Sequence, residues 1–225
     1  MEKNPALRQV TFLVSGNGGN LKFFHFALLR GLIRGIRINV VADRDCGAVD
    51  FARRHQIDSR IVSYKRTESA ELRNVLDEWR PDLIVTNWNK IIDESTVCAY
   101  RGILVNLHYS LLPAFGGLIG MEPVRRAYAQ GCMFIGPTCH IVDEGVDTGP
   151  ILAQAIFRTD MPFEQAVQVM FRKGCLTLLN GIREVLGCSL VLVTGSSGDS
   201  IEYAPRLGYD ENIFNESFWG EVAKS

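Results

Sequence analysis

Short apolar runs and amphipathic segments alternate along the first half of the chain. Runs such as VTFLVSG and DLIVTN are apolar at nearly every position, which is typical of strands buried on both faces of a parallel sheet. The expected strands cover residues 10–16, 38–43, 60–64, 82–87 and 102–106, and the expected helices cover residues 21–33, 47–57, 69–80 and 93–101. This alternation predicts an α/β fold, with a Rossmann-like, open and mostly parallel sheet flanked by helices. Ser69 is expected to cap the third helix.

The pattern changes after Pro113. A helix is expected over residues 120–131, because Pro123 falls in its first turn. Two antiparallel strands joined by the loop EGVDT, and then a long helix, are expected over residues 138–143, 149–158 and 162–186.

The last part of the chain, residues 189–225, is expected to begin with a strand and to end in an aromatic-rich tail. The segment from Tyr203 to Trp219 is expected to cover a sheet edge or to form a homodimer contact. We expect residues 1–188 to form the main body and residues 189–225 to be an appendage of the same domain.

Composition narrows the class of protein. The chain has 225 residues, of which 47% are hydrophobic and 22% charged, and its net charge is −1, as in ordinary soluble globular proteins. Without a basic excess, nucleic acid is not expected as a partner. No apolar run approaches the ~18 residues of a membrane span, and the first residues lack a secretory signal. The six cysteines form no C-x-x-C motif, so we expect a reducing cytoplasm rather than a disulfide framework.

Polar residues gather where the expected strands end, which is where open α/β sheets bind ligands. Asn106 and His108 follow the run GILV, and the segment HIVDEGVDTGP supplies carboxylates on a glycine-bounded loop. An imidazole beside a carboxylate has a fixed tautomer and raised basicity, and an amide N–H can stabilise an oxyanion. Two alternatives stay open at this point: His108 is a buried structural histidine, or His108, His140 and an aspartate bind a metal, although their spacing matches no zinc pattern.

The segment SGNGGN follows the first strand and resembles an anion cradle. Glycines there allow backbone N–H groups at a helix N-terminus to face a phosphate. The dinucleotide fingerprint G-x-G-x-x-G fails, because Leu21 stands at the third glycine, although Asp43 mimics its ribose-binding acid. The alternative is a tight turn without a ligand.

Two longer motifs carry a family resemblance. The segments NLHYSLLP and HIVDEGVDTGPILAQ resemble the signature of the folate-dependent formyltransferases, N-x-H-P-S-L-L-P followed by H-x-V-x-x-x-x-D-x-G-P. The resemblance covers most of residues 10–185 and implies the same α/β fold, with residues 1–188 as the catalytic domain. The segment LVSGNGGNL is similar to the purine-pathway branch of the family, in which this loop holds the substrate phosphate.

The resemblance implies a catalytic trio of Asn106, His108 and Asp147. An amine of the acceptor would attack the formyl carbon of 10-formyltetrahydrofolate. Asn106 and protonated His108 would stabilise the oxyanion, and Asp147 would pair with His108 and help to relay the proton. No covalent enzyme intermediate and no metal are needed.

The same resemblance implies two binding regions. The folate pocket would be formed by Trp88, Asn89, Lys90, Ile91, Ile92, Asp143, Glu144, Gly145 and Val146, with Leu104 as an apolar wall. The acceptor, a small molecule with a primary amine and an anionic group, would be held by Gly16, Asn17, Gly18, Gly19 and Asn20.

Departures from the family pattern lie on the acceptor side. Tyr109 replaces the usual proline, the segment AFGGLIGMEP lacks the histidines of the purine enzymes, and Arg172 and Lys173 stand where those enzymes have an acid. The acceptor is therefore left open between glycinamide ribonucleotide or a relative, a nucleotide-linked amino sugar and a hydroxyornithine-type amine. Two other classes remain, a non-catalytic folate- or nucleotide-binding protein and an NAD-dependent oxidoreductase, the latter disfavoured by Leu21.

Overall fold

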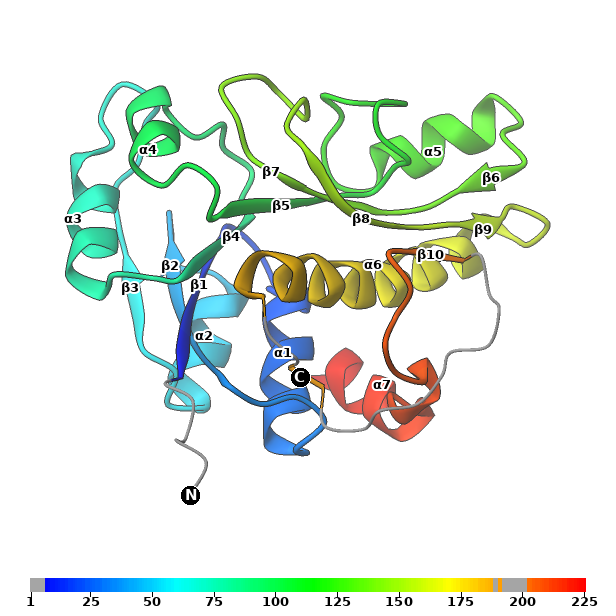
Figure 1. Cartoon of the computed structure of the whole chain (residues 1–225), viewed down its shortest axis with the longest axis horizontal. Coiled ribbons are helices and arrows are strands. Elements are labelled where there is room, and N and C mark those ends of the chain that lie inside the picture. The colour runs from blue at the N-terminus through cyan, green and yellow to red at the C-terminus, as the bar shows by residue number, and fades with distance from the viewer. Residues whose placement is uncertain (1–6, 188–189, 192–201) are drawn as a thin grey trace.

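An eight-stranded sheet forms the centre of the computed structural model, which describes residues 7–187, 190–191 and 202–225 (Figure 1). Its strand order is β10-β8-β7-β5-β4-β1-β2-β3. The strands are β1 (Arg8–Val14), β2 (Ile36–Ala42), β3 (Ser59–Ile61), β4 (Leu83–Asn87), β5 (Leu104–His108), β7 (Thr138–Ile141), β8 (Ile151–Ala155) and β10 (Tyr203–Ala204). Strands β1 to β5 pair in parallel, whereas β7, β8 and β10 are antiparallel to their neighbours. The expectation of an open, mostly parallel sheet is confirmed.

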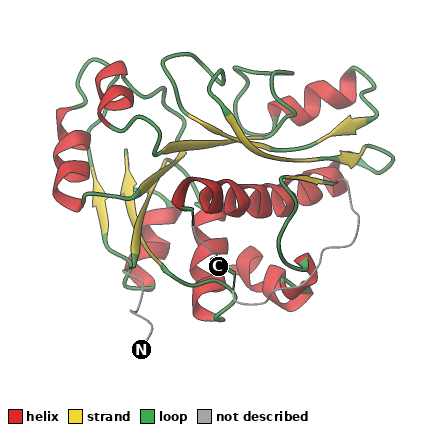
Figure 2. Cartoon of the chain, in the orientation of Figure 1, coloured by secondary structure: helices red, strands yellow, loops and turns green. Residues whose placement is uncertain are grey.

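Helices cover both faces of the sheet (Figure 2). They are α1 (Gly19–Leu29), α2 (Gly47–Arg54), α3 (Ala70–Trp79), α4 (Glu94–Ala99), α5 (Glu122–Ala129), α6 (Phe163–Leu186) and α7 (Glu216–Lys224), with a 3-10 turn at Glu211–Ile213 and a separate ribbon of β6 (Phe134–Ile135) and β9 (Phe157–Arg158). Successive side chains of β1 enter different cores: Phe12 belongs to the core that includes α1, α2, α6 and α7, and Leu13 to the core that includes α3 and α4. Burial on both faces explains why the strands are apolar at nearly every position.

Local backbone chemistry corrects two expectations. The first helix ends at Leu29 rather than at residue 33, because Gly31 takes a left-handed conformation with φ 66°. Ser69 precedes α3, but its side chain makes no capping hydrogen bond. Asp93 does cap the next helix, since its carboxylate accepts from the Thr96 backbone N–H.

The C-terminal tail joins the main core. Strand β10 pairs with β8 and so covers that sheet edge, as expected. Phe214, Phe218 and Trp219 surround Phe23 of α1, with ring centroids 5.1, 5.6 and 5.5 Å away. The strand expected from residue 189 lies largely outside the described residues, and the homodimer contact stays a prediction.

Two further properties concern the described residues alone. None of their helices is long and apolar enough to cross a membrane. Five cysteines in this part of the chain are free thiols: Cys46, Cys98, Cys132, Cys139 and Cys175.

Burial of His25 beside His55 is expected to make the free energy of unfolding depend on pH. His25 Nε2 lies 3.1 Å from His55 Nδ1. Burial and the charge of His55 lower the pKa of His25 from 6.5 to about 4, although Glu221 raises it. The unfolded chain therefore takes up this proton at higher pH than the folded chain, and stability present above pH 6.5 is lost as the pH falls towards 4. We expect His25→Gln to lose less free energy of unfolding than the wild type between pH 7 and pH 4.5, as measured by urea denaturation. An equal acid loss in both proteins would contradict this.

Candidate active site

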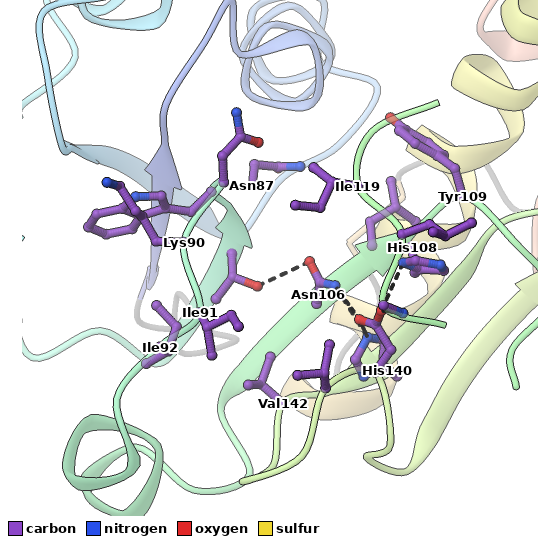
Figure 3. Close-up of a pocket in the computed structure, with 18 of the residues that line it drawn as sticks. Asn87, Lys90, Ile91, Ile92, Asn106, His108, Tyr109, Ile119, His140 and Val142 are labelled. Atoms are coloured by element: carbon purple, nitrogen blue, oxygen red, sulfur yellow. Dashed lines mark hydrogen bonds and ion pairs between the residues drawn. The ribbon is translucent and has the colours of Figure 1, made fainter. Parts of the chain in front are cut away.

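Strand geometry brings three polar side chains together at the end of β5. Asn106 and His108 are two residues apart, so they lie on the same face of the strand. Strand β7 runs antiparallel to β5, and its His140 is directly paired with Asn106. Figure 3 shows the side chains of Asn106, His108 and His140 converging at this point.

Asp147 reaches this cluster from the loop between β7 and β8. Its Oδ2 lies 3.3 Å from His108 Nδ1, and its Oδ1 lies 3.5 Å from His140 Nε2. The same Oδ1 lies 3.4 Å from the amide nitrogen of Asn106. Asp147 therefore contacts both other residues of the predicted trio, although it lies 41 positions after Asn106 along the chain.

Two residues at the site have backbone φ angles in the left-handed region, which residues other than glycine rarely adopt. Asp147 has φ 55° and Phe115 has φ 59°. The backbone of Gly117 donates a hydrogen bond of 2.8 Å to Asp147 Oδ2, and the Phe115 carbonyl lies 3.1 Å from His108 Nε2. The unusual conformations thus aim one carboxylate and one carbonyl at the His108 ring, and such strain is concentrated at functional sites.

Two residues that were not assigned to the trio orient Asn106. The Thr86 hydroxyl donates to Asn106 Oδ1 at 3.2 Å. His140 Nδ1 donates to the Ile141 carbonyl at 2.8 Å, and its Nε2 lies 3.3 Å from Asn106 Nδ2. The Thr86 contact holds the amide oxygen on the side of β4, so the amide nitrogen faces His140 and Asp147. Sequence reasoning considered His140 only as a metal ligand and missed Thr86, although the histidine that opens HIVDEGVD was a visible signal.

The charge states follow from burial and contacts. Burial raises the pKa of Asp147, but hydrogen bonds from His140 and Gly117 and the charge of His108 outweigh it and hold the pKa below its ordinary value. Burial lowers the pKa of His108 and outweighs Asp147 and the Phe115 carbonyl, which raise it. The site therefore favours an ionised carboxylate beside a neutral imidazole at neutral pH.

This arrangement suits the stabilisation of a developing oxyanion and the movement of a proton. The two His108 nitrogens face two acceptors, Asp147 and the Phe115 carbonyl. A neutral ring can donate to only one of them, so a proton gained during a reaction would find a partner already in place. Among the described residues, no group of three His, Cys, Asp or Glu side chains could hold a metal ion.

The trio lies in a cavity of about 330 Å³. The cavity is lined by segments 86–92, 106–109, 117–120 and 145–147, and by His140, Val142 and Asp143. Of the predicted folate-pocket residues, all line it except Leu104 and Glu144. Leu104 is fully buried in the core with α3 and α4, and Glu144 pairs with Arg101 outside the cavity.

Exposed apolar side chains form part of the cavity wall. Ile91, Ile119 and Val146 line it and remain 52%, 67% and 50% exposed. Trp88 Nε1 and Asn87 Oδ1 are buried and have no hydrogen-bond partner. Part of the wall is thus apolar, and two lining residues carry a buried donor and a buried acceptor that no protein group satisfies.

The glycine loop after β1 lies apart from this cavity, since none of residues 16–20 lines it. Gly16 and Asn17 are exposed, whereas Asn20 is buried and accepts from the Cys175 thiol at 3.3 Å. Gly18 takes a left-handed φ of 67° and leaves α1 without a side-chain cap. Uncapped N–H groups suit an anion, and the loop as an acceptor site stays a prediction.

Three charged residues that the sequence analysis discussed, Asp43, Arg172 and Lys173, form ion pairs within the protein. Asp43 is 3% exposed in its side chain and pairs with Arg44 at 2.6 Å and with Lys90 at 3.7 Å. Arg172 binds Glu216, and Lys173 binds Glu202 at 2.6 Å. Arg172 and Lys173 therefore tie α6 to the C-terminal tail.

Comparison with known proteins agrees with this geometry. A family model described as formyl transferase matches residues 8–172. The chloroplastic phosphoribosylglycinamide formyltransferase of Arabidopsis thaliana is 32% identical over 179 residues, which are 74% of this chain and 61% of that protein. Formyltetrahydrofolate deformylase of Haemophilus influenzae is 31% identical over 130 residues, 56% of this chain and 45% of that protein. The chain thus spans between 45% and 61% of the length of these two relatives.

A solved structure with a similar fold extends the comparison. The crystal structure of glycinamide ribonucleotide transformylase 1 from Symbiobacterium toebii has a TM-score of 0.72 and 28% identity to this chain. The match covers 80% of this chain and 89% of that one.

Proposed function

The chain belongs to the formyl transferase family, and from this premise we propose that it transfers a formyl group from 10-formyltetrahydrofolate to the primary amine of a small acceptor. The observation that supports this most directly is the contact of Asn106, His108 and Asp147 inside the cavity. A merely folate-binding protein would have no need for a carboxylate, an imidazole and an amide aimed at one another.

In this proposal, 10-formyltetrahydrofolate supplies an activated formyl group when bound between segments 88–92 and 143–146. Asn106 Nδ2 donates to the formyl oxygen as negative charge develops there. Its contacts to His140 and Asp147, at 3.3 and 3.4 Å, are long and leave it free to do so.

His108 and Asp147 handle the proton. The amine loses a proton as its bond to the formyl carbon forms, and the folate nitrogen gains one as its bond to that carbon breaks. His108 is neutral before the reaction and can hold the proton beside the oxyanion, while Asp147 stabilises the imidazolium. The Phe115 carbonyl holds the ring in place.

For the acceptor, we propose glycinamide ribonucleotide or a relative whose anionic group binds the backbone of the glycine loop, at Gly16, Asn17, Gly18, Gly19 and the N–H of Asn20. The uncapped first turn of α1 and the exposure of Gly16 and Asn17 support this. The names of the plant relative and of the Symbiobacterium structure point to the same acceptor. A nucleotide-linked amino sugar or a hydroxyornithine-type amine is the alternative.

A second candidate is hydrolysis of the folate, with water in place of the amine. It is favoured by one observation: the cavity that holds the trio is not lined by the glycine loop. The Haemophilus relative is named a formyltetrahydrofolate deformylase.

One assay separates these candidates. The protein is incubated with 10-formyltetrahydrofolate alone and with each of the three amine classes, and both formylated amine and free formate are measured. Amine-dependent product supports transfer, and formate released without an amine supports hydrolysis. Folate binding without either product would overturn both.

Because its described cysteines are free, we also propose that the protein works in the reducing cytoplasm.

The folate pocket can be tested on its apolar wall. Val146→Glu places a charge against the bound ring, so we expect the Kd for the folate donor to rise by about 10-fold or more. Ile151→Glu is the matched control, because Ile151 is similarly exposed, at 48% against 50%, and does not line the cavity. Equal affinities of the two variants, measured by fluorescence titration, would place the folate elsewhere.

A further inference from the structure

Tyr109 occupies the boundary between the catalytic cavity and the glycine loop. It directly follows His108 and lines the cavity, while its half-buried ring belongs to the opposite face of the strand from His108. Figure 3 shows the ring directed away from Asn106 and His140. The Tyr109 hydroxyl contacts the side chain of Asn20, in the first turn of α1.

Helix α6 is shaped to accept this ring. A Cβ on Gly174 would lie 2.8 Å from Tyr109 Cε1, so only glycine leaves room for the ring in its observed position. One residue later, the Cys175 thiol donates to Asn20 Oδ1 at 3.3 Å. Asn20 is 4% exposed, so its amide is enclosed between α6 and Tyr109 rather than offered to solvent.

These contacts connect the catalytic trio with the glycine loop, which lie on different secondary-structure elements. The trio is carried by β5 and the loop after β7, whereas the glycine loop is carried by β1 and α1. Tyr109 is covalently next to His108, and it contacts Asn20 at the end of the glycine loop. A shift of the Tyr109 ring would therefore move the glycine loop relative to the trio.

We propose that Tyr109 is a positioning residue that sets the spacing between the catalytic trio and the anion-binding loop, and so selects acceptors by the distance between their amine and their anionic group. This inference rests on the proposed formyl transfer to an anionic acceptor. Only acceptors with a matching distance between amine and anionic group then reach the trio and the glycine loop at the same time. The binding energy of the anion helps to hold the amine against Asn106 and His108.

The test is kinetic and uses the amine that the wild type formylates best. Tyr109→Phe removes the hydroxyl and keeps the ring. We expect the acceptor KM to rise by about 3- to 10-fold, the usual effect of losing one polar contact, with kcat and the Kd for the folate donor nearly unchanged. Adding Tyr109→Phe to Asn20→Ala should raise the KM no further, because the same contact is already lost.

Tyr128→Phe is the matched control. Its hydroxyl donates to the Met161 carbonyl at 3.0 Å, and neither Tyr128 nor Met161 lines the cavity. It should lower the melting temperature about as much as Tyr109→Phe and leave the acceptor KM unchanged. Gly174→Ala, which presses on the Tyr109 ring, should raise the KM again.

Three outcomes are decisive. An acceptor KM that rises in Tyr109→Phe but not in Tyr128→Phe supports the inference. An unchanged KM in Tyr109→Phe, with transfer by the wild type intact, overturns the inference and leaves the proposed function standing. A wild type that transfers no formyl group to any amine overturns the proposed function, and this inference with it.

Discussion

Replacing His108 by alanine, or Asp147 by asparagine, is expected to lower kcat for formyl transfer by ~10² or more. His108→Ala removes the ring that holds the proton beside the oxyanion. Asp147→Asn keeps the size of the side chain and its place near the Gly117 N–H, but it removes the charge 3.3 Å from His108 Nδ1. Single-turnover measurements with saturating folate and acceptor would isolate this loss from binding.

The folate Kd separates a catalytic effect from a collapsed pocket. We expect it to stay within a few-fold of the wild type in both variants, because segment 88–92 and the apolar wall are untouched. His55→Ala, which removes a histidine remote from the cavity, serves as the control and should keep its turnover. Near-wild-type turnover in either His108→Ala or Asp147→Asn would eliminate the proposed roles.

Gly149→Ala is expected to destabilise the fold and the site together. A Cβ on Gly149 would lie 1.9 Å from the backbone oxygen of Ile141, so the backbone of the β7–β8 hairpin must move. Asp147 is two residues away and already holds an unfavourable φ of 55°. We expect the free energy of unfolding to fall by about 2 kcal/mol or more, and turnover to fall with it as Asp147 leaves His108. Chemical denaturation and the transfer assay measure the two effects.

Gly220→Ala is the matched control. Gly220 lies within α7, and a Cβ there would meet nothing within 4 Å. Alanine favours helices over glycine by up to about 1 kcal/mol, so this variant should be as stable as the wild type or more so. Equal stabilities of Gly149→Ala and Gly220→Ala would show that the hairpin adjusts without cost.

The amino-acid sequence by itself determined the architecture, and its family resemblance nominated the trio. Continuous apolar runs indicated strands buried on both faces, and Phe12 and Leu13 do enter opposite cores. Asn106 and His108 are two residues apart, so the period of two along a strand puts both on one face once the strand is known to reach them. These are local rules of backbone geometry and burial, so they can be applied along the chain without knowing what each residue meets.

Contacts between distant segments were decided only by the tertiary structure. Leu104 belongs to a strand that was predicted correctly, yet it faces α3 and α4 rather than the folate cavity. Glu144 lies in the predicted loop, yet it turns to Arg101. Ser69 precedes its helix and does not cap it. In each case the direction of a side chain depends on a partner far away in the chain.

The acceptor side depends most on such contacts. The glycine motif was visible in the sequence, but its separation from the cavity and the enclosure of Asn20 were not. Tyr109 was seen only as a departure from a motif, because its role depends on Gly174 and Asn20, which lie 65 and 89 positions away along the chain. A sequence pattern encodes which face of its own element a residue occupies, and packing between elements decides what that face touches.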